Sequence, residues 1–157
     1  MIKMKKLALI IMIATIFTAC GSGGEKKEED KTGISDKEMV MSKFANEVPQ
    51  VTWEYGDVDG KRVPVYQREY NEDGTLFKEG PLENQRRHGA WKSYYRDGTL
   101  WSDNNYNHGA IDGKTITYFP NGKKRYEGYF KNASKTGVWK FWNEAGEFEK
   151  EVDMDNR

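Results

Sequence analysis

Four acidic residues recur at a constant interval of 24 residues and are the first candidates for chemistry: Glu79, Asp103, Glu127 and Glu151. A row of carboxylates could bind calcium or a cationic partner, and a close pair could hydrolyse a glycosidic bond. If the interval reflects the hairpins of one sheet, neighbouring acids lie about 9–10 Å apart, too far to share one calcium ion at Ca–O distances of about 2.3–2.6 Å. A flat sheet also offers no cleft for a catalytic pair. We therefore expect these acids to form structural pairs with basic residues.

The two histidines, His88 and His108, are the other candidates for catalysis or metal binding. They lie 20 residues apart rather than 24, so they do not occupy equivalent places in a repeat. Their spacing is not that of two ligands on one helix, and no serine lies in the setting of a nucleophile elbow. Each histidine precedes a glycine, as in a solvated loop. The sequence therefore predicts no metal site, no cofactor and no enzymatic activity.

Aromatic residues are the candidates for recognition, and five of them define a possible binding strip: Trp91, Tyr95, Trp101, Phe119 and Trp139. A single sheet has two faces, and both carry aromatic residues here. If nothing covers the second face, some of these rings are exposed and mark an interaction surface. The alternative is that the aromatic residues are the core that joins one hairpin to the next. The sequence leaves both interpretations open.

The element that must position these side chains is a repeated β-hairpin. Glycines recur every 24 residues in turn-forming dipeptides, which are Asp73-Gly74, Asp97-Gly98, Asn121-Gly122 and Ala145-Gly146. Asp-Gly or Asn-Gly between apolar runs favours a two-residue turn with positive φ at both positions. Four hairpins at one interval predict an all-β fold, in which the hairpins stack into one elongated antiparallel sheet. The core of such a sheet is expected to be thin and rich in aromatic residues.

Folding each turn about its glycine predicts the strand register. If Asp97-Gly98 are the two loop residues, Lys92 faces Asp103 and Tyr94 faces Trp101. Opposite charges and paired aromatic rings in such positions stabilise a hairpin. The same rule predicts the pairs Arg68–Glu79, Tyr70–Phe77, Ile116–Glu127, Tyr118–Arg125 and Lys140–Glu151.

The chain divides into four expected segments of different composition. They are a signal peptide (1–19), a lipidated flexible tether (20–34), a capping helix with a divergent first hairpin (35–65) and the repeat array (66–157). The helix is predicted over 35–47, because Ser35 to Glu38 fits a capping box and Pro49 ends the helical pattern. The first hairpin is expected to turn at Asp59-Gly60.

Cys20 is the only cysteine, which excludes a disulfide within one chain. The residues Phe17-Thr18-Ala19-Cys20 resemble a bacterial lipobox, which implies that Cys20 is acylated and becomes the mature N-terminus. The alternative is an ordinary secretory signal with an incidental cysteine. Gly21 supplies no acidic retention signal, which favours the outer membrane or the cell surface. The mature chain would carry 22 basic and 25 acidic residues, since three of the 25 basic residues lie before Cys20, and this balance argues against nucleic acid as a partner.

Three stretches, residues 89–100, 113–122 and 137–146, share one order of residue types. A glycine is followed by Trp or Thr, then by paired aromatic residues and a turn ending in glycine. This order resembles the MORN-variant repeat of bacterial proteins, and the resemblance covers about residues 66–152. It implies a stacked-hairpin fold. Proteins with these repeats are often described as YwqK-type antitoxins, and eukaryotic MORN arrays are associated with membrane junctions and protein scaffolds.

The function that fits these observations best is an exported, lipid-anchored interaction or scaffold module at a bacterial envelope. Its membrane contact is the lipid on Cys20, and its partner is expected to be another protein. One alternative is a toxin-neutralising antitoxin or immunity protein. Another is a binder of glycan or peptidoglycan, with Trp91 and Trp139 as stacking platforms.

Overall fold

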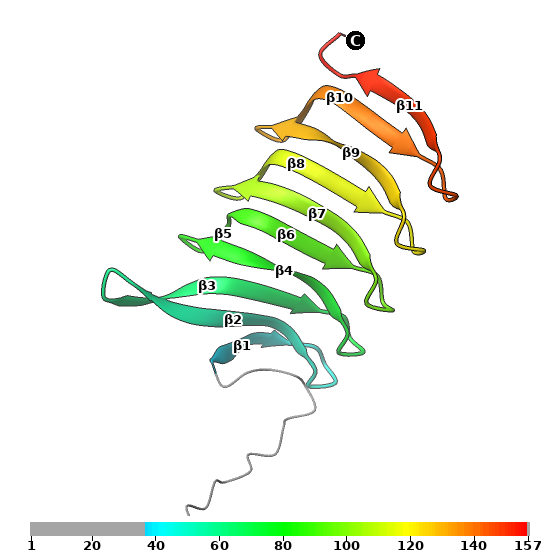
Figure 1. Cartoon of the computed structure of the whole chain (residues 1–157). Coiled ribbons are helices and arrows are strands. Elements are labelled where there is room, and N and C mark those ends of the chain that lie inside the picture. The colour runs from blue at the N-terminus through cyan, green and yellow to red at the C-terminus, as the bar shows by residue number, and fades with distance from the viewer. Residues whose placement is uncertain (1–36, 157) are drawn as a thin grey trace, which may run out of the picture.

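The computed structural model describes residues 37–156, which form one antiparallel sheet and contain no helix. The hairpins follow one another in chain order along a long, single-layered sheet (Figure 1). The order of neighbours is β1-β2-β3-β4-β6-β7-β8-β9-β10-β11, and the short strand β5 pairs with β4. The predicted all-β fold with a single elongated sheet is confirmed. The strands are β1 (Glu38–Lys43), β2 (Pro49–Val58), β3 (Lys61–Tyr70), β4 (Leu76–Glu83), β5 (Arg86–Arg87), β6 (Gly89–Tyr94), β7 (Leu100–Asn107), β8 (Ala110–Tyr118), β9 (Lys124–Lys131), β10 (Ser134–Trp142) and β11 (Phe148–Asp153).

The expected helix over 35–47 is wrong in the part of it that the structure describes. Residues 38–43 form the edge strand β1, in which Met39 faces Trp53 of β2. A helix of this length is marginal unless an apolar face packs on a neighbour. A strand instead pairs its backbone with the otherwise open edge of β2. The chain turns back after β1 through a hydrogen bond that the Phe44 N–H donates to the Val48 carbonyl oxygen at 2.8 Å.

The turns that contain the 24-residue glycine series are three-residue loops rather than two-residue primed turns. In one of them the Gly98 N–H donates to the Tyr95 carbonyl at 3.0 Å, and the Tyr95 N–H donates to the Thr99 carbonyl at 2.9 Å. Gly98 has a φ of 84°, whereas Asp97 is not among the residues with positive φ. This is a type I turn closed by a left-handed glycine, the geometry of a G1 bulge. The Asp97 side chain fixes it by accepting the Thr99 N–H at 2.9 Å.

The extra loop residue shifts the register at the end of each hairpin. Tyr94 pairs with Leu100, so the predicted pairing with Trp101 is wrong. For the same reason Tyr70 pairs with Leu76 instead of Phe77, and Tyr118 pairs with Lys124 instead of Arg125. Beyond the bulge the predicted register is correct.

Two-residue primed turns lie at the opposite edge of the sheet. Both residues of each turn have positive φ, as type I′ geometry requires. The turn at Asp59-Gly60 was expected from the sequence, and it is confirmed. The four turns are Asp59-Gly60, Asn84-Gln85, His108-Gly109 and Asn132-Ala133. The three-residue loops lie along one side of the sheet, where strands end, and we call this side the bulge edge. The two-residue turns lie along the opposite side, which we call the primed edge; neither name refers to an edge strand.

A continuous row of mostly charged residues crosses one face of the sheet. The predicted pairs Arg68–Glu79, Lys92–Asp103, Ile116–Glu127 and Lys140–Glu151 all lie opposite each other in the register. Pairs between hairpins connect them into one row, and we call this side of the sheet the charged face. The row is Arg68, Glu79, Lys92, Asp103, Ile116, Glu127, Lys140 and Glu151.

The other face carries the buried core, and we call it the tryptophan face. Among residues 37–156 the buried hydrophobic side chains are Leu82, Trp91 and Trp139, and both tryptophans are 1% exposed. Each indole occupies the space above a glycine of the neighbouring strand. A Cβ at Gly80 would lie 2.4 Å from Trp91, and a Cβ at Gly128 would lie 2.3 Å from Trp139.

The repeat between the two tryptophans uses a different pair in the same row. Asn104 of β7 faces Thr115 of β8, and the Thr115 hydroxyl donates to the Asn104 side-chain oxygen. The row on this face therefore reads Gly80, Trp91, Asn104, Thr115, Gly128 and Trp139.

A cation and an aromatic ring cover each indole on its outer side. The Arg87 guanidinium lies 4.6 Å from the ring centroid of Trp91, and Tyr106 meets the same indole edge-on at 6.1 Å. Lys135 Nζ lies 4.4 Å from the ring centroid of Trp139, with Phe130 edge-on at 5.2 Å. A single-layered sheet can thereby bury two tryptophans without a second sheet or a helix.

Candidate functional site

The structure divides the five aromatic candidates into two groups. Trp91 and Trp139, which the sequence suggested as exposed members of a binding strip, are buried on the tryptophan face. That expectation is wrong because Gly80 and Gly128 leave room for the indoles to lie against the sheet. The Trp91 indole N–H also donates to the Pro81 carbonyl at 2.8 Å. These two residues are core residues, and neither presents a ring face on which a sugar could stack.

The other three candidates, Tyr95, Trp101 and Phe119, lie together at the bulge edge, and we call them the aromatic edge. The rings of Tyr95 and Trp101 have centroids 6.2 Å apart, and Trp101 is 38% exposed. The Tyr95 hydroxyl reaches the next hairpin and donates to the Tyr118 carbonyl at 2.9 Å. Tyr95 and Phe119 are half-buried. Tyr95 and Phe119 lie at the closing hydrogen bonds of two bulge loops, and Trp101 lies near the start of β7.

A hollow of about 430 Å³ continues the aromatic edge toward the C-terminal hairpin. Its aromatic lining comes from Phe119, Phe141 and Trp142. Arg125 also lines it, and its guanidinium lies 5.6 Å from the Phe119 ring centroid. Aromatic rings beside an arginine are the residue types that dominate protein–protein contacts.

Two of the four acids in the row, Glu79 and Glu127, form ion pairs with basic residues, as expected from the sequence. Asp103 and Glu151 lie opposite Lys92 and Lys140 in the register. Glu79 lies 3.4 Å from Arg68 Nε, and its Oε1 accepts the Tyr94 hydroxyl at 2.7 Å. Burial, together with the nearby Glu79 carboxylate, raises the pKa of Tyr66 to about 12. Burial and the hydrogen bond to Glu79 raise the pKa of Tyr94 as well. Glu79 is therefore the centre of a structural network of tyrosines and arginine.

Glu127 occupies the equivalent place two repeats later and is also paired. Lys124 Nζ lies 2.8 Å from its Oε2, and Lys114 Nζ lies 3.8 Å away. The hydrogen bond from Lys124 lowers the pKa of this carboxyl. Within residues 37–156, the acids of the row do not gather into a group of three potential metal ligands.

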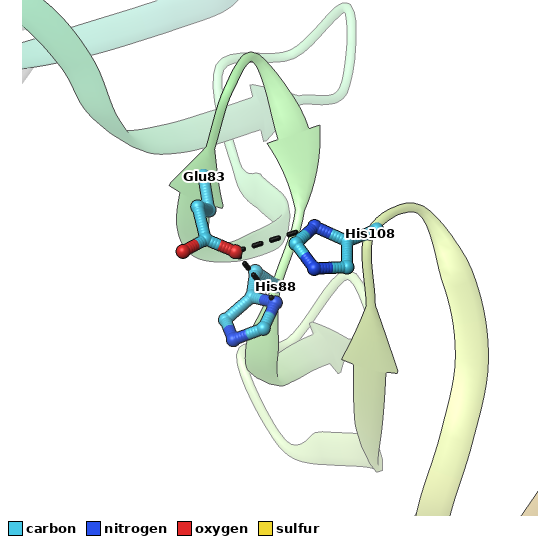
Figure 2. A group of neighbouring side chains, drawn as sticks. All are labelled: Glu83, His88 and His108. Atoms are coloured by element: carbon cyan, nitrogen blue, oxygen red, sulfur yellow. Dashed lines mark ion pairs between the residues drawn. The ribbon is translucent and has the colours of Figure 1, made fainter.

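The two histidines, in contrast, come together with one acid at the primed edge (Figure 2). His88 Nδ1 lies 3.2 Å from Glu83 Oε2, and His108 Nδ1 lies 3.3 Å from the same oxygen. The two imidazole centroids are 5.2 Å apart. His108 is the first residue of the turn between β7 and β8. In the neighbouring hairpin, Glu83 is the last residue of β4 and His88 directly follows β5. Sequence reasoning missed this group. The two histidines are 20 residues apart in the chain, and their closeness in space follows only from the positions of the two-residue turns at the primed edge.

Cys20 and the segments predicted as signal peptide and tether lie outside the described residues. Their assignment remains a prediction. Within residues 37–156 no helix has the length and hydropathy needed to cross a membrane.

Comparison with protein families matches two stretches of the chain, residues 87–108 and 111–132, to the MORN repeat variant. The first match runs from β5 to the turn at His108, and the second runs from β8 to the turn at Asn132. Each match is therefore one hairpin bounded by the primed edge, with the bulge loop in its middle. No curated protein matches the chain. The match covers two repeats and supports the repeat architecture predicted from the sequence.

Proposed function

We propose that this protein is an exported, lipid-anchored module that binds another protein through the aromatic edge of its repeat sheet. The carrying observation is that Tyr95, Trp101 and Phe119 lie together at the surface beside a hollow lined by further aromatic residues. Rigid aromatic side chains lose little conformational entropy on binding, so they contribute strongly to interfaces. A repeat sheet with this composition fits an interaction module.

The proposed attachment to a membrane has its support in the sequence. Cys20 follows an apolar stretch at a lipobox-like site, and acylation there would anchor the sheet to a bacterial envelope. The outer membrane or the cell surface is the favoured location. This attachment would keep the repeat sheet close to partners in the same envelope.

The proposal is tested by affinity capture from a detergent extract of the native envelope. The variant Trp101→Ala/Phe119→Ala removes two rings of the aromatic edge. Tyr129→Ala is the matched control, because Tyr129 is an aromatic residue of β9 that is 51% exposed and is not part of this edge. We expect wild type and the control to retain a near-stoichiometric protein that the double variant loses.

Two outcomes would contradict the proposal. One is capture of the same protein by the double variant, and the other is capture of no protein by the wild type. Trp91→Ala is not used, because loss of a buried indole would change the fold itself. If the captured protein is a toxin, the antitoxin or immunity alternative gains the support that it now lacks.

A further inference from the structure

We propose that Glu83, His88 and His108 form a binding site for a late first-row divalent metal ion, with Zn²⁺ as the best fit. The site lies at the primed edge and uses none of the residues of the aromatic edge. It is therefore independent of the proposed protein-binding function. Figure 2 shows the three side chains meeting between two adjacent hairpins.

The separations between the ligand atoms fit a tetrahedral ion. Two imidazole Nδ1 atoms lie 3.2 Å and 3.3 Å from one carboxylate oxygen of Glu83. The three candidate ligand atoms all lie within 4.8 Å of one another. With Zn–N and Zn–O bonds of about 2.0–2.2 Å, the edges of a regular tetrahedron are about 3.3–3.6 Å long. The two nitrogen–oxygen separations are already close to these edges, so each histidine nitrogen can share one ion with the Glu83 oxygen after little movement.

His88 Nδ1 is available for coordination. The atom is buried, and among the described residues no donor or acceptor is aligned with it as a hydrogen-bond partner. It lies 3.2 Å from Glu83 Oε2, but the two atoms do not have hydrogen-bond geometry. A buried nitrogen without a partner costs free energy, and a metal ion at the centre of the group would remove that cost.

The next repeat supplies an internal comparison, because its backbone is the same. Gly109 N–H donates to the Arg87 carbonyl at 2.8 Å, and Ala133 N–H donates to the Ile111 carbonyl at 2.9 Å. Moving each member of the group by 24 residues gives Asn107, Asp112 and Asn132.

Of those residues, Asp112 forms an ion pair with a lysine and accepts a hydrogen bond from the turn. Asp112 Oδ2 lies 3.5 Å from Lys131 Nζ and accepts the Asn132 N–H at 3.3 Å. The fold of the primed edge therefore does not require histidines. At the first turn position Asn is well suited to positive φ, as at Asn84 and Asn132, and His108 replaces it with a ligand.

The chemistry of the donors selects the metal. Two imidazole nitrogens and one carboxylate match a three-ligand zinc site, in which water or another group takes the fourth position. Calcium and magnesium prefer shells made entirely of oxygen atoms, so they fit poorly. Glu83 and His88 also line a groove of about 710 Å³ together with Val63, Pro64 and Leu82, which gives an ion access from solvent.

The test is isothermal titration calorimetry with Zn²⁺ on the full-length protein in detergent. All samples carry Cys20→Ser, which removes the thiol as a competing ligand, and none carries a polyhistidine tag. His88→Thr and His108→Asn introduce residues that other repeats hold at the same places, Thr136 and Asn132, so they preserve the fold. Asp112→Asn alters the equivalent position of the next repeat and is the matched control.

We expect one zinc per chain for wild type and for Asp112→Asn. Each histidine substitution is expected to weaken binding by at least about tenfold, since even residues that only support a ligand contribute that much to metal affinity. Co²⁺ in place of Zn²⁺ should give the visible absorption of a four-coordinate ion in wild type and not in His88→Thr/His108→Asn. The proposal is overturned if wild type binds no zinc, or if the double histidine variant binds as tightly as wild type. Equal loss in Asp112→Asn, or displacement of zinc by Mg²⁺, would overturn it as well.

Discussion

The indole of Trp139 lies in the space that a side chain on Gly128 would occupy. A Cβ built on Gly128 would be 2.3 Å from Trp139 Cδ2, closer than carbon atoms approach without a shift of the structure. Trp91 and Gly80 repeat this relationship two hairpins earlier. Glycine is normally unfavourable inside a strand, and a large aromatic residue opposite it restores the lost packing.

This contact predicts that Gly128→Ala destabilises the protein although alanine tolerates strands better than glycine. The added methyl group overpacks the site, which we expect to cost about 1–3 kcal/mol in the free energy of unfolding. Trp139→Ala should cost about 3–5 kcal/mol. Urea denaturation of both variants and of Gly128→Ala/Trp139→Ala gives a double-mutant cycle. We expect the double variant to lose less free energy of unfolding than the sum of the two single losses, because the methyl group no longer meets an indole. Additivity within about 0.5 kcal/mol would argue against the contact.

The tyrosine network around Glu79 predicts a stability change at high pH. The pKa of Tyr66 is raised to about 12 by burial and by Glu79, so the folded state keeps its proton where the unfolded state loses it. The contribution of this residue to stability is therefore complete below about pH 10 and is lost as the pH rises toward 12.

Two measurements check this sign. The difference in tyrosinate absorbance between wild type and Tyr66→Phe should show Tyr66 ionising well above its ordinary range. Urea denaturation at increasing alkaline pH should show a steeper loss of stability for wild type than for Tyr66→Phe. Glu79→Gln should move the titration part of the way back, because burial is the larger cause. Ionisation of Tyr66 near pH 10 in wild type would contradict the network.

The bulge loops predict that an amide replaces a carboxylate there better than a methyl group does. Asp97 accepts the Thr99 N–H, and Asn121 accepts the Lys123 N–H in the same way at 3.0 Å. We therefore expect Asp97→Asn to be less stable than wild type but more stable than Asp97→Ala.

Acid should reduce the difference between wild type and Asp97→Ala. The Thr99 N–H lowers the pKa of the Asp97 carboxyl, so its stabilising effect is present above the ordinary pKa of aspartate and disappears as the pH falls through the folded-state value. Urea denaturation of wild type and Asp97→Ala at neutral pH and at about pH 2 measures this difference with the carboxyl charged and with it protonated. An equal gap at the two pH values would show that the charged carboxylate is not the cause.

The charged face could be predicted from the sequence because charges recur with the same period as the glycines. Arg68 and Glu79, or Lys140 and Glu151, remain opposite each other whichever loop type closes the hairpin, since the bulge absorbs the extra residue before them. The loop type itself was not predictable from Asp97-Gly98. The same dipeptide fits a primed turn and the last two positions of a three-residue loop, and only the hydrogen bonds distinguish them.

Two other features needed the three-dimensional register. The burial of Trp91 depends on Gly80 in a neighbouring strand, and neither residue indicates this by its local sequence. His88 and His108 meet at the primed edge, whose turns have no shared dipeptide: Asn84-Gln85 and Asn132-Ala133 contain no glycine at all. The 24-residue glycine period therefore marks the three-residue loops of the bulge edge and does not mark the two-residue turns of the primed edge.

The row on the tryptophan face has a longer period than the loops. Trp91 and Trp139 are separated by Asn104 and Thr115, so the pattern returns after 48 residues and not after 24. Deleting residues 99–122 would join β6 to β9 through one bulge loop and would bring Gly128 beside Trp91. Each indole would still lie over its own glycine, Trp91 over Gly80 and Trp139 over Gly128. We therefore expect the array to remain folded without this repeat, so its length can change in steps of one hairpin.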